Sequence, residues 1–252
     1  MSRIKFLNTY IDNLTMQEAL DRTEHLINKD GYSYVVTPNL DHIVILESDP
    51  EFVEVYSNAD LILTDGKPLI WISKLLKNPI KEKISGSDFF PLMCEMCAKK
   101  GYSIFILGAA EGVADKAAKN LCNKYKGQKI VGTYSPPIGF EKDTEELKKI
   151  RNLIKTAKPD VLAVSLGSPK GEKFLYKHLE EYEVSLGMSI GATIDFEAGN
   201  LKRAPKWMAK HGLEWFFRLI QEPKRLASRY WNDAIKIIPI VKKYGRKTRE
   251  KL

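Results

Sequence analysis

The 252-residue sequence predicts an α/β fold in which helices flank a largely parallel β-sheet. Short apolar runs of strand length alternate with helical patterns over residues 1–199, as in chains built from strand–helix–strand units. Several of these runs end in Gly, Thr, Asn or Asp, and no internal repeat or long linker interrupts the series. Open α/β sheets bind ligands at the carboxyl ends of their strands, so we expect a site there.

Charge is distributed unevenly along the chain. Hydrophobic residues make up 44% of it, enough for a substantial core in one domain or two closely joined lobes. The net charge is +8, but residues 202–252 hold 15 Lys and Arg against four acidic residues, so the preceding part is net negative. We predict an α/β domain over residues 1–199 and a basic, amphipathic, helical appendage over residues 200–252. The appendage should contact phosphates, nucleic acid or a lipid surface.

The sequence shows no sign of export or of a bound metal. It has neither a membrane-spanning apolar window nor an apolar signal region near Met1, so we expect the chain to stay inside the cell. Cys94 and Cys97 form a C-x-x-C string in an apolar helical run, where packing is favoured over zinc or redox chemistry. The four histidines have no metal-ligand spacing, and we predict no metal and no cofactor.

The first third of the chain contains three predicted strands. Residues 4–11 alternate apolar and polar side chains and predict the first strand. Thr15 and Glu18 form a capping box for a helix that ends near Asn28. The next strands are predicted at residues 32–36 and 61–63, and helices at 39–45, 50–58 and 69–76.

Polar side chains follow the second and third of these strands. Asp65 comes after residues 61–63, and Thr37 and Asn39 follow residues 32–36, where Pro38 prevents the strand from continuing. Because the carboxyl ends of parallel strands share one edge of a sheet, these three residues are candidates for a common site. A carboxylate there suits acid–base chemistry, although an Asp before Gly is often only a turn residue.

The middle of the chain adds a candidate phosphate-binding turn. Residues 81–88 form a polar loop in which Ser87 or Asp88 is placed to cap the helix that runs to Lys99. The strand Ser103–Gly108 leads through a glycine turn into an alanine-rich helix, an arrangement that offers backbone N–H groups to a phosphate. The turn lacks the G-x-G-x-x-G pattern, so by itself it indicates a phosphate only weakly.

Three further strands complete the predicted sheet. They lie at Lys129–Tyr134, 161–167 and 184–190, and a charged helix at Thr144–Ala157 precedes the second of them. After residue 167, small flexible residues again lead into a helix, with Lys170 near any bound anion. The last strand ends in residues 191–195.

From Gly199 onward the chain is basic and rich in aromatic residues. Pro205 and Pro223 are predicted first-turn prolines of two helices that Gly212 separates. Beyond Pro223, basic side chains are mixed with bulky apolar ones, as in helices that lie on an anionic membrane surface. The alternative is an ordinary solvated helix with a frayed tail.

Several short strings occur together in one order along the chain. They are T-P-N from Thr37, L-T-D-G from Leu63, S-G-S-D from Ser85, F-I-L-G from Phe105, G-T-Y-S-P-P from Gly132, G-S-P-K from Gly167, G-A-T-I-D-F from Gly191, and R-A-P from Arg203 with G-L-E-W from Gly212. Together they resemble the WecG/TagA/CpsF glycosyltransferases, family 26, over roughly residues 8–230. One such string alone would be unspecific, whereas the ordered set is highly specific.

The resemblance implies a Rossmann-like fold with a C-terminal appendage, and an inverting, metal-independent reaction. Members of this family transfer a sugar from a UDP-sugar to a membrane-held sugar linked to polyprenyl diphosphate. The best-known members transfer N-acetylmannosamine or its uronic acid in the assembly of teichoic acid or enterobacterial common antigen. The resemblance further implies a peripheral position on the inner face of the cell membrane, a homo-oligomer and no nucleic-acid partner.

The resemblance also assigns roles to particular residues. Asp65 would be the base, and Thr37 and Asn39 would line the donor and acceptor cleft. Lys83 would act in catalysis, together with Arg218 and Arg225 of the appendage, whose positive charge suits a departing UDP. The substrate-binding residues would be Gly108, Ala109, Tyr134, Gly167, Pro169, Gly171, Gly191 and Asp195.

Two departures from the family pattern leave the donor sugar open. Gly171 stands where the family usually has Gln, which removes an amide that would contact the donor or the nucleotide. Lys83 keeps the charge of the usual Arg but loses its bidentate geometry. The Y-S-P-P loop from Tyr134 is more similar to exopolysaccharide members than to teichoic-acid members.

Two other classes of function remain as alternatives. A non-catalytic UDP-binding regulator would use the same sheet and turns, but it would lose no function in an Asp65→Asn variant. A nucleic-acid-binding protein would use the basic appendage, although the appendage is rich in aliphatic residues and contains no nucleic-acid motif. Binding to anionic liposomes rather than to duplex DNA would argue against that class.

Overall fold

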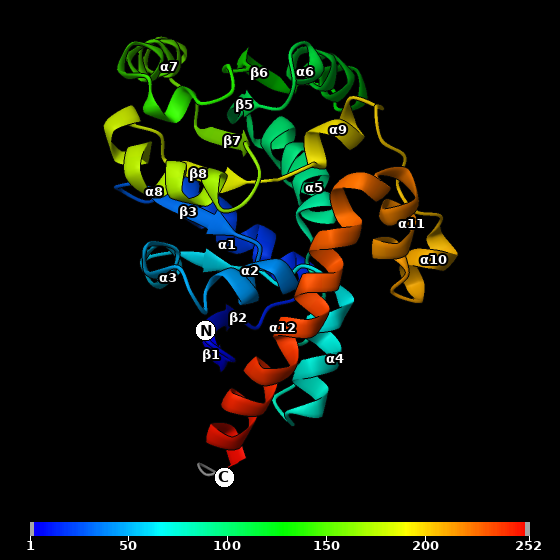
Figure 1. Cartoon of the computed structure of the whole chain (residues 1–252). Coiled ribbons are helices and arrows are strands. Elements are labelled where there is room, and N and C mark those ends of the chain that lie inside the picture. Colours follow the sequence, from blue (N-terminus) through cyan, green and yellow to red (C-terminus); the bar gives the residue numbers. More distant parts are fainter. Residues whose placement is uncertain (1–2, 250–252) are drawn as a thin grey trace.

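A parallel sheet of six strands forms the centre of the computed structural model, which describes residues 3–249 except for the side chains of Lys206 and residues 246–249. The strand order is β4-β3-β8-β7-β5-β6, and every neighbouring pair is parallel. The strands are β3 (Ser33–Val36), β4 (Leu61–Ile62), β5 (Ser103–Gly108), β6 (Lys129–Tyr134), β7 (Val161–Ser165) and β8 (Leu186–Ser189). Helices cover both faces of this sheet (Figure 1), which confirms the predicted α/β fold.

Alternate residues of each strand point to opposite faces and build two apolar cores. Tyr34 and Val36 of β3 pack in one core, whereas Val35 packs in the other. The first core lies under α3 (Pro50–Ser57), α7 (Thr144–Ala157) and α8 (Lys170–Tyr182), with the short helix η1 (Phe140–Lys142). The second lies under α1 (Met16–Asn28), α5 (Gly86–Lys100), α6 (Val113–Lys124) and α9 (Thr193–Glu197).

Two local sequence signals have the predicted structural roles. Thr15 and Glu18 form the capping box of α1, in which the Thr15 hydroxyl accepts from the Glu18 N–H at 3.3 Å. Cys94 and Cys97 are buried free thiols of α5 in the second core, so their predicted packing role is confirmed.

The prediction of one strand over residues 4–11 is wrong. These residues form an antiparallel hairpin of β1 (Arg3–Phe6) and β2 (Thr9–Asp12), with a turn in which Leu7 has a positive φ of 50°. The apolar–polar alternation belongs to both strands, and the turn contains no Gly or Pro that would have marked the break. Asp12 attaches the hairpin to the main sheet, because its carboxylate accepts from the Ile62 N–H at 2.9 Å.

Residues after Gly199 form α10 (Lys206–Lys210), α11 (Glu214–Gln221) and α12 (Pro223–Arg249). As predicted, Pro223 begins α12 and Gly212 breaks the preceding segment, but Pro205 is the N-cap of α10 and not a first-turn residue, and α11 is a third helix that was not predicted. The long helix α12 runs beside α2 (Leu40–Ile45) and α4 (Lys67–Leu75), as Figure 1 shows. Leu226 and Ile240 are buried against the body. Within residues 3–249, none of the helices has the length and apolar character needed to cross a membrane.

Candidate active site

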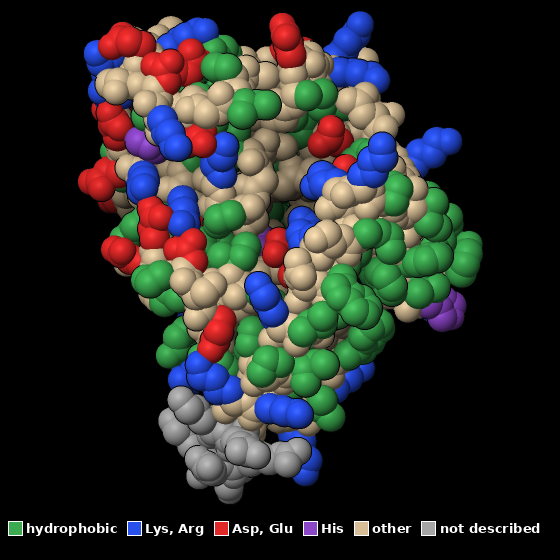
Figure 2. All heavy atoms as spheres, viewed as in Figure 1, with side chains coloured by type: hydrophobic (Ala, Val, Ile, Leu, Met, Phe, Trp, Pro, Cys, Tyr) green, Lys and Arg blue, Asp and Glu red, His purple; other side chains and the backbone are tan. Residues whose placement is uncertain are grey.

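A cavity of about 520 Å³ lies at the carboxyl ends of β3, β4, β7 and β8. Loops after these strands form one wall, and α11 and α12 form another. Part of the cavity is visible in Figure 2 as a hollow between the body and the C-terminal helices. This is the edge of the sheet at which the sequence predicted a site. The cavity brings together seven of the predicted site residues: Thr37, Asn39, Asp65, Gly167, Gly191, Arg218 and Arg225.

Asp65 follows β4 and has a strongly altered pKa. Its backbone N–H donates to the Pro38 carbonyl at 2.9 Å, which joins the loops after β3 and β4. Protein surrounds the side chain, but part of its surface opens into the cavity. Burial raises the pKa of the Asp65 carboxyl to about 7, against the opposing effect of Lys83. A carboxylate with a pKa near neutrality in a cavity wall is suited to accept a proton.

Thr37 and Asn39 lie on either side of Pro38, and so close to Asp65. Asn39 caps α2, because its side-chain oxygen accepts from the His42 N–H at 3.2 Å. Thr37 is buried, and both residues line the cavity. Asn39 therefore fixes the start of α2 in the cavity wall, and Asn39 itself is in reach of a ligand in the cavity.

Lys83 lies near Asp65 but does not line the cavity. Its Nζ atom pairs with Asp88 Oδ2 at 2.9 Å and with Glu214 Oε2 at 2.8 Å. Burial acts to lower the pKa of Lys83, but the carboxylates of Glu214 and Asp88 outweigh it, so the pKa is raised. Lys83 is therefore a charged link between the start of α5 and the start of α11.

The prediction that Ser87 or Asp88 caps α5 is wrong. Ser85 is the N-cap, and its hydroxyl oxygen accepts from the Asp88 N–H at 3.3 Å. The Asp88 carboxylate instead pairs with Lys83 and with Arg203 of the C-terminal segment. The carboxylate also accepts a hydrogen bond from the Ser85 hydroxyl at 2.7 Å, and the helix begins earlier than predicted, at Gly86.

Four arginines of the C-terminal segment line the cavity: Arg203, Arg218, Arg225 and Arg229. Arg225 donates to both carboxylate oxygens of Glu222, at 2.8 and 2.7 Å, and Arg218 donates at 3.4 Å. The hydrogen bonds from Arg225 hold the pKa of Glu222 below its ordinary value. Guanidinium groups are well suited to binding phosphate oxygens. Across residues 3–249, no three His, Cys, Asp or Glu side chains are grouped so as to hold a metal ion.

The cavity wall also has an acidic, buried part whose residues were not among the predicted site residues. Glu172 is 3% exposed, and its Oε1 atom lies 4.0 Å from Nε2 of His42. Burial raises the pKa of Glu172 to about 7 and lowers the pKa of His42 to about 3, so His42 is neutral at pH 7. Asp41 pairs with Arg229 at 3.7 Å, and burial raises the pKa of Asp233 to about 6. The available signal was that Glu172 lies in the first turn of a helix after a strand end.

Six predicted substrate-binding residues do not line the cavity: Gly108, Ala109, Tyr134, Pro169, Gly171 and Asp195. Gly108 has a φ of 109°, and a Cβ there would lie 2.3 Å from the Ser165 carbonyl oxygen, so close packing of β5 against β7 requires glycine. The Tyr134 hydroxyl bonds to Glu146 and Lys149 of α7. Asp195 lies close enough to Arg218 for that arginine to act on its pKa, which burial raises. Substrate binding by these six residues stays a prediction.

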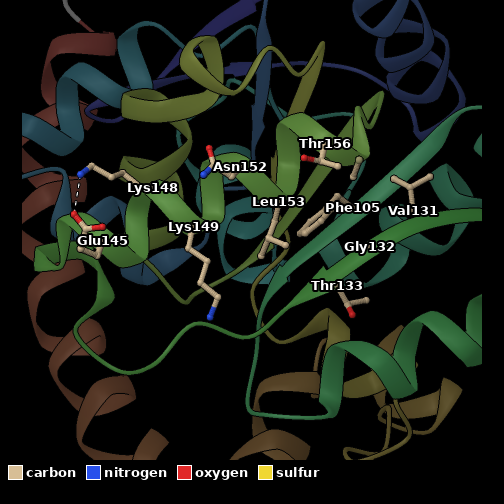
Figure 3. Close-up of a pocket in the computed structure, with 11 residues that line it drawn as sticks. Phe105, Val131, Gly132, Thr133, Glu145, Lys148, Lys149, Asn152, Leu153 and Thr156 are labelled. Atoms are coloured by element: carbon tan, nitrogen blue, oxygen red, sulfur yellow. Dashed lines mark hydrogen bonds and ion pairs between the residues drawn. The ribbon is translucent and has the colours of Figure 1, made fainter.

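A second cavity, of about 800 Å³, lies between β6 and α7 (Figure 3). Its wall combines the apolar side chains of Phe105, Val131 and Leu153 with Lys148 and Lys149. Strands β6 and β4 are the outermost strands on opposite sides of the sheet, so this cavity is separate from the one beside Asp65. None of the predicted site residues lines it.

Comparison with known proteins identifies the family. The family model described as Glycosyl transferase WecG/TagA/CpsF family matches residues 4–251. A Bacillus subtilis protein named N-acetylglucosaminyldiphosphoundecaprenol N-acetyl-beta-D-mannosaminyltransferase is 34% identical over 216 residues, which are 84% of this chain and 81% of the relative. A protein of the same name from Bacillus spizizenii is 31% identical over 203 residues, 81% of this chain and 76% of the relative. Another, from Staphylococcus aureus strain MW2, is 25% identical over 246 residues, 95% of this chain and 90% of the relative. The chain, as its ordered strings predicted, belongs to the WecG/TagA/CpsF family and is a glycosyltransferase.

Proposed function

We propose that this glycosyltransferase transfers N-acetylmannosamine or a related hexose from a UDP-sugar to a sugar linked to polyprenyl diphosphate. The names of the relatives support this, because they describe N-acetylmannosaminyl transfer to a lipid-linked diphosphate sugar. The observation that carries the proposal is one cavity that combines Asp65, whose pKa is about 7, with four arginines. The reaction would serve the assembly of a cell-surface polysaccharide or teichoic acid.

In the proposed mechanism Asp65 is the base. The acceptor hydroxyl loses its proton to the Asp65 carboxylate as its oxygen attacks the anomeric carbon of the donor. The bond between that carbon and UDP breaks in the same displacement, so the configuration at the carbon inverts. Thr37 and Asn39, which the Asp65–Pro38 hydrogen bond keeps near the carboxylate, would orient the acceptor.

The arginines stabilise the departing UDP. Negative charge grows on the diphosphate as the bond breaks, and guanidinium groups that are already in place reduce its energy. Arg218 and Arg225 are held by their shared contact with Glu222, so little side-chain ordering is needed when the diphosphate binds. With this charge supplied by side chains, we propose that the reaction needs no metal ion.

The acceptor would reach the cavity from a membrane surface. Figure 2 shows hydrophobic side chains gathered over the C-terminal helices. The large exposed ones on α10, α11 and α12 are Trp207, Trp215, Phe216, Ile220, Trp231, Ile235 and Ile238. Aromatic and aliphatic groups beside basic residues are typical of helices on anionic membranes. We propose that the protein lies peripherally on the inner face of the cell membrane. When it is not bound to the membrane, homo-oligomers would cover part of the apolar surface of the C-terminal helices.

A transfer assay tests the proposal. Purified protein is given UDP-N-acetylmannosamine, UDP-N-acetylglucosamine, UDP-glucose or a uronic-acid donor, together with an N-acetylglucosaminyl-diphosphate lipid, with and without EDTA. We expect transfer from one of these donors, no loss of rate in EDTA, and a product of opposite anomeric configuration by NMR. Absence of transfer from every donor would contradict the proposed reaction, and a retained configuration would contradict direct displacement.

A further inference from the structure

Glu172, in the first turn of α8, lines the cavity and has a buried oxygen atom without a hydrogen-bond partner among the described residues. Oε1 accepts a hydrogen bond from the Ser189 hydroxyl at 2.9 Å, whereas Oε2 has no partner among the described residues. Ser168, which also lines the cavity, lies close enough to lower the pKa of Glu172. The Ser168 Oγ atom is likewise buried and without a hydrogen-bond partner within residues 3–249. Two neighbouring residues of the cavity wall therefore each carry a buried, unsatisfied polar atom.

The surroundings hold the Glu172 carboxyl in one place. The Ser189 hydroxyl has room to donate because residue 171 is glycine: a Cβ there would lie 2.9 Å from Ser189 Oγ. On the other side lies His42, whose Nδ1 atom is 2.6 Å from the Tyr56 hydroxyl oxygen. Glu172 is thus a carboxyl fixed between β8 and α2, not a mobile surface group.

An unsatisfied buried carboxyl oxygen is costly, and a ligand that donates to it recovers that cost. A hydroxyl group suits both unpaired atoms, because it can donate to Glu172 Oε2 and accept from the Ser168 hydroxyl. A diphosphate does not suit them, since it offers only acceptors and the carboxylate repels it. The pyranose rings of a sugar donor and of a sugar acceptor both carry such hydroxyl groups.

We infer that Glu172 and Ser168 form a subsite that binds a ring hydroxyl of a sugar substrate. The inference rests on the proposed function, because it requires that the sugar enter the cavity that holds Asp65. The two parts of the cleft then bind different groups. The arginines bind the diphosphate, and the Glu172 carboxyl determines specificity for the uncharged sugar ring.

The test compares Glu172→Gln and Ser168→Ala with the wild type. A matched control is Glu180→Gln, which removes a carboxylate from the exposed surface of the same helix. Calorimetry gives Kd for UDP and for the UDP-sugar, kinetics give KM for donor and lipid acceptor, and thermal melting reports folding. In Glu172→Gln we expect Kd or KM for one sugar substrate to rise about tenfold, with Kd for UDP unchanged within about twofold. Ser168→Ala should raise Kd or KM for the same substrate, and Glu180→Gln should change neither constant for any substrate.

The substrate that is affected identifies the ring that occupies the subsite. Unchanged constants for both sugar substrates in Glu172→Gln and Ser168→Ala would overturn the inference, and so would an equal loss of affinity for UDP. If the wild type transfers no sugar but binds a UDP-sugar more tightly than UDP, and Glu172→Gln removes that difference, the subsite stands while the proposed reaction fails.

Discussion

At the scale of single residues, the chemistry of Asp65 comes from its surroundings. The side chain of an aspartate in water has a pKa near 4. At pH 7 this carboxylate is almost fully ionised, but it is a weak base and accepts a proton poorly. Burial after β4 raises the Asp65 pKa to about 7. The wall that buries it includes α11, which comes from a distant part of the chain.

Replacing this carboxylate should stop the chemistry and spare the binding of nucleotide. We expect Asp65→Asn to lower kcat by about 10²-fold or more, because the amide cannot accept the proton. The affinity for UDP should stay nearly the same, because the arginines are untouched. Kinetics and calorimetry measure the two quantities, with exposed Asp30→Asn as a control. Full activity of Asp65→Asn would end the assignment of Asp65 as the base.

The raised pKa also predicts the pH dependence. Below pH 7 an increasing fraction of Asp65 is protonated and unable to accept a proton, so kcat/KM should fall as pH decreases through about 7. Glu172 titrates in the same range, with a pKa of about 7. The acid limb should therefore persist in Glu172→Gln and be absent from the residual activity of Asp65→Asn. The opposite pattern would assign the base to Glu172.

At the scale of elements, the link from Lys83 to Asp88 and Glu214 joins α5 to α11 beside the base. Since Lys83 lowers the Asp65 pKa, Lys83→Met should raise it and move the acid limb of the pH profile upward by roughly one unit. Lys83→Arg, which keeps the charge, should leave the midpoint almost in place. Lys81→Met is the control, because Lys81 pairs with Glu18 at the surface of the same loop. An unmoved midpoint in Lys83→Met would refute the coupling.

At the scale of the whole molecule, α12 has two different apolar surfaces. Leu226 and Ile240 are buried against the body, whereas Trp231, Ile235 and Ile238 are exposed. Deleting residues 200–252 would uncover apolar surface of the body, so substitutions on the exposed side are the cleaner test of membrane binding.

Replacing Trp231, Ile235 and Ile238 together by Ser should weaken binding to anionic liposomes by more than about tenfold. Each of these side chains, when it is buried in the lipid, contributes roughly 1.5–3 kcal/mol to the free energy of membrane binding. The melting temperature should change little, because these residues are exposed in the folded protein. Ile240→Ser is the converse control, expected to cost about 2–4 kcal/mol of folding stability because Ile240 is buried. Liposome pull-down and thermal melting measure both effects. Unchanged liposome binding by the triple variant would contradict the proposed membrane surface.

The sequence by itself determined those features that depend on neighbours along the chain. The capping box of Thr15 and Glu18, the apolar runs of β3 to β8, and the polar residues that follow β3 and β4 are all local. The direction of parallel strands then places Thr37, Asn39 and Asp65 at one edge of the sheet. The order of strings along the whole chain was enough to identify the family.

Only the tertiary structure decided which distant side chains meet and how deeply they are buried. The pairs Lys83–Glu214, Asp88–Arg203 and Ser189–Glu172 connect different elements, and no pattern in the sequence specifies them. The pKa values of Asp65 and Glu172 follow from burial among those elements. The sequence could therefore name a carboxylate at a strand end, while the packing of helices around it decided its proton affinity, because desolvation depends on the whole enclosure.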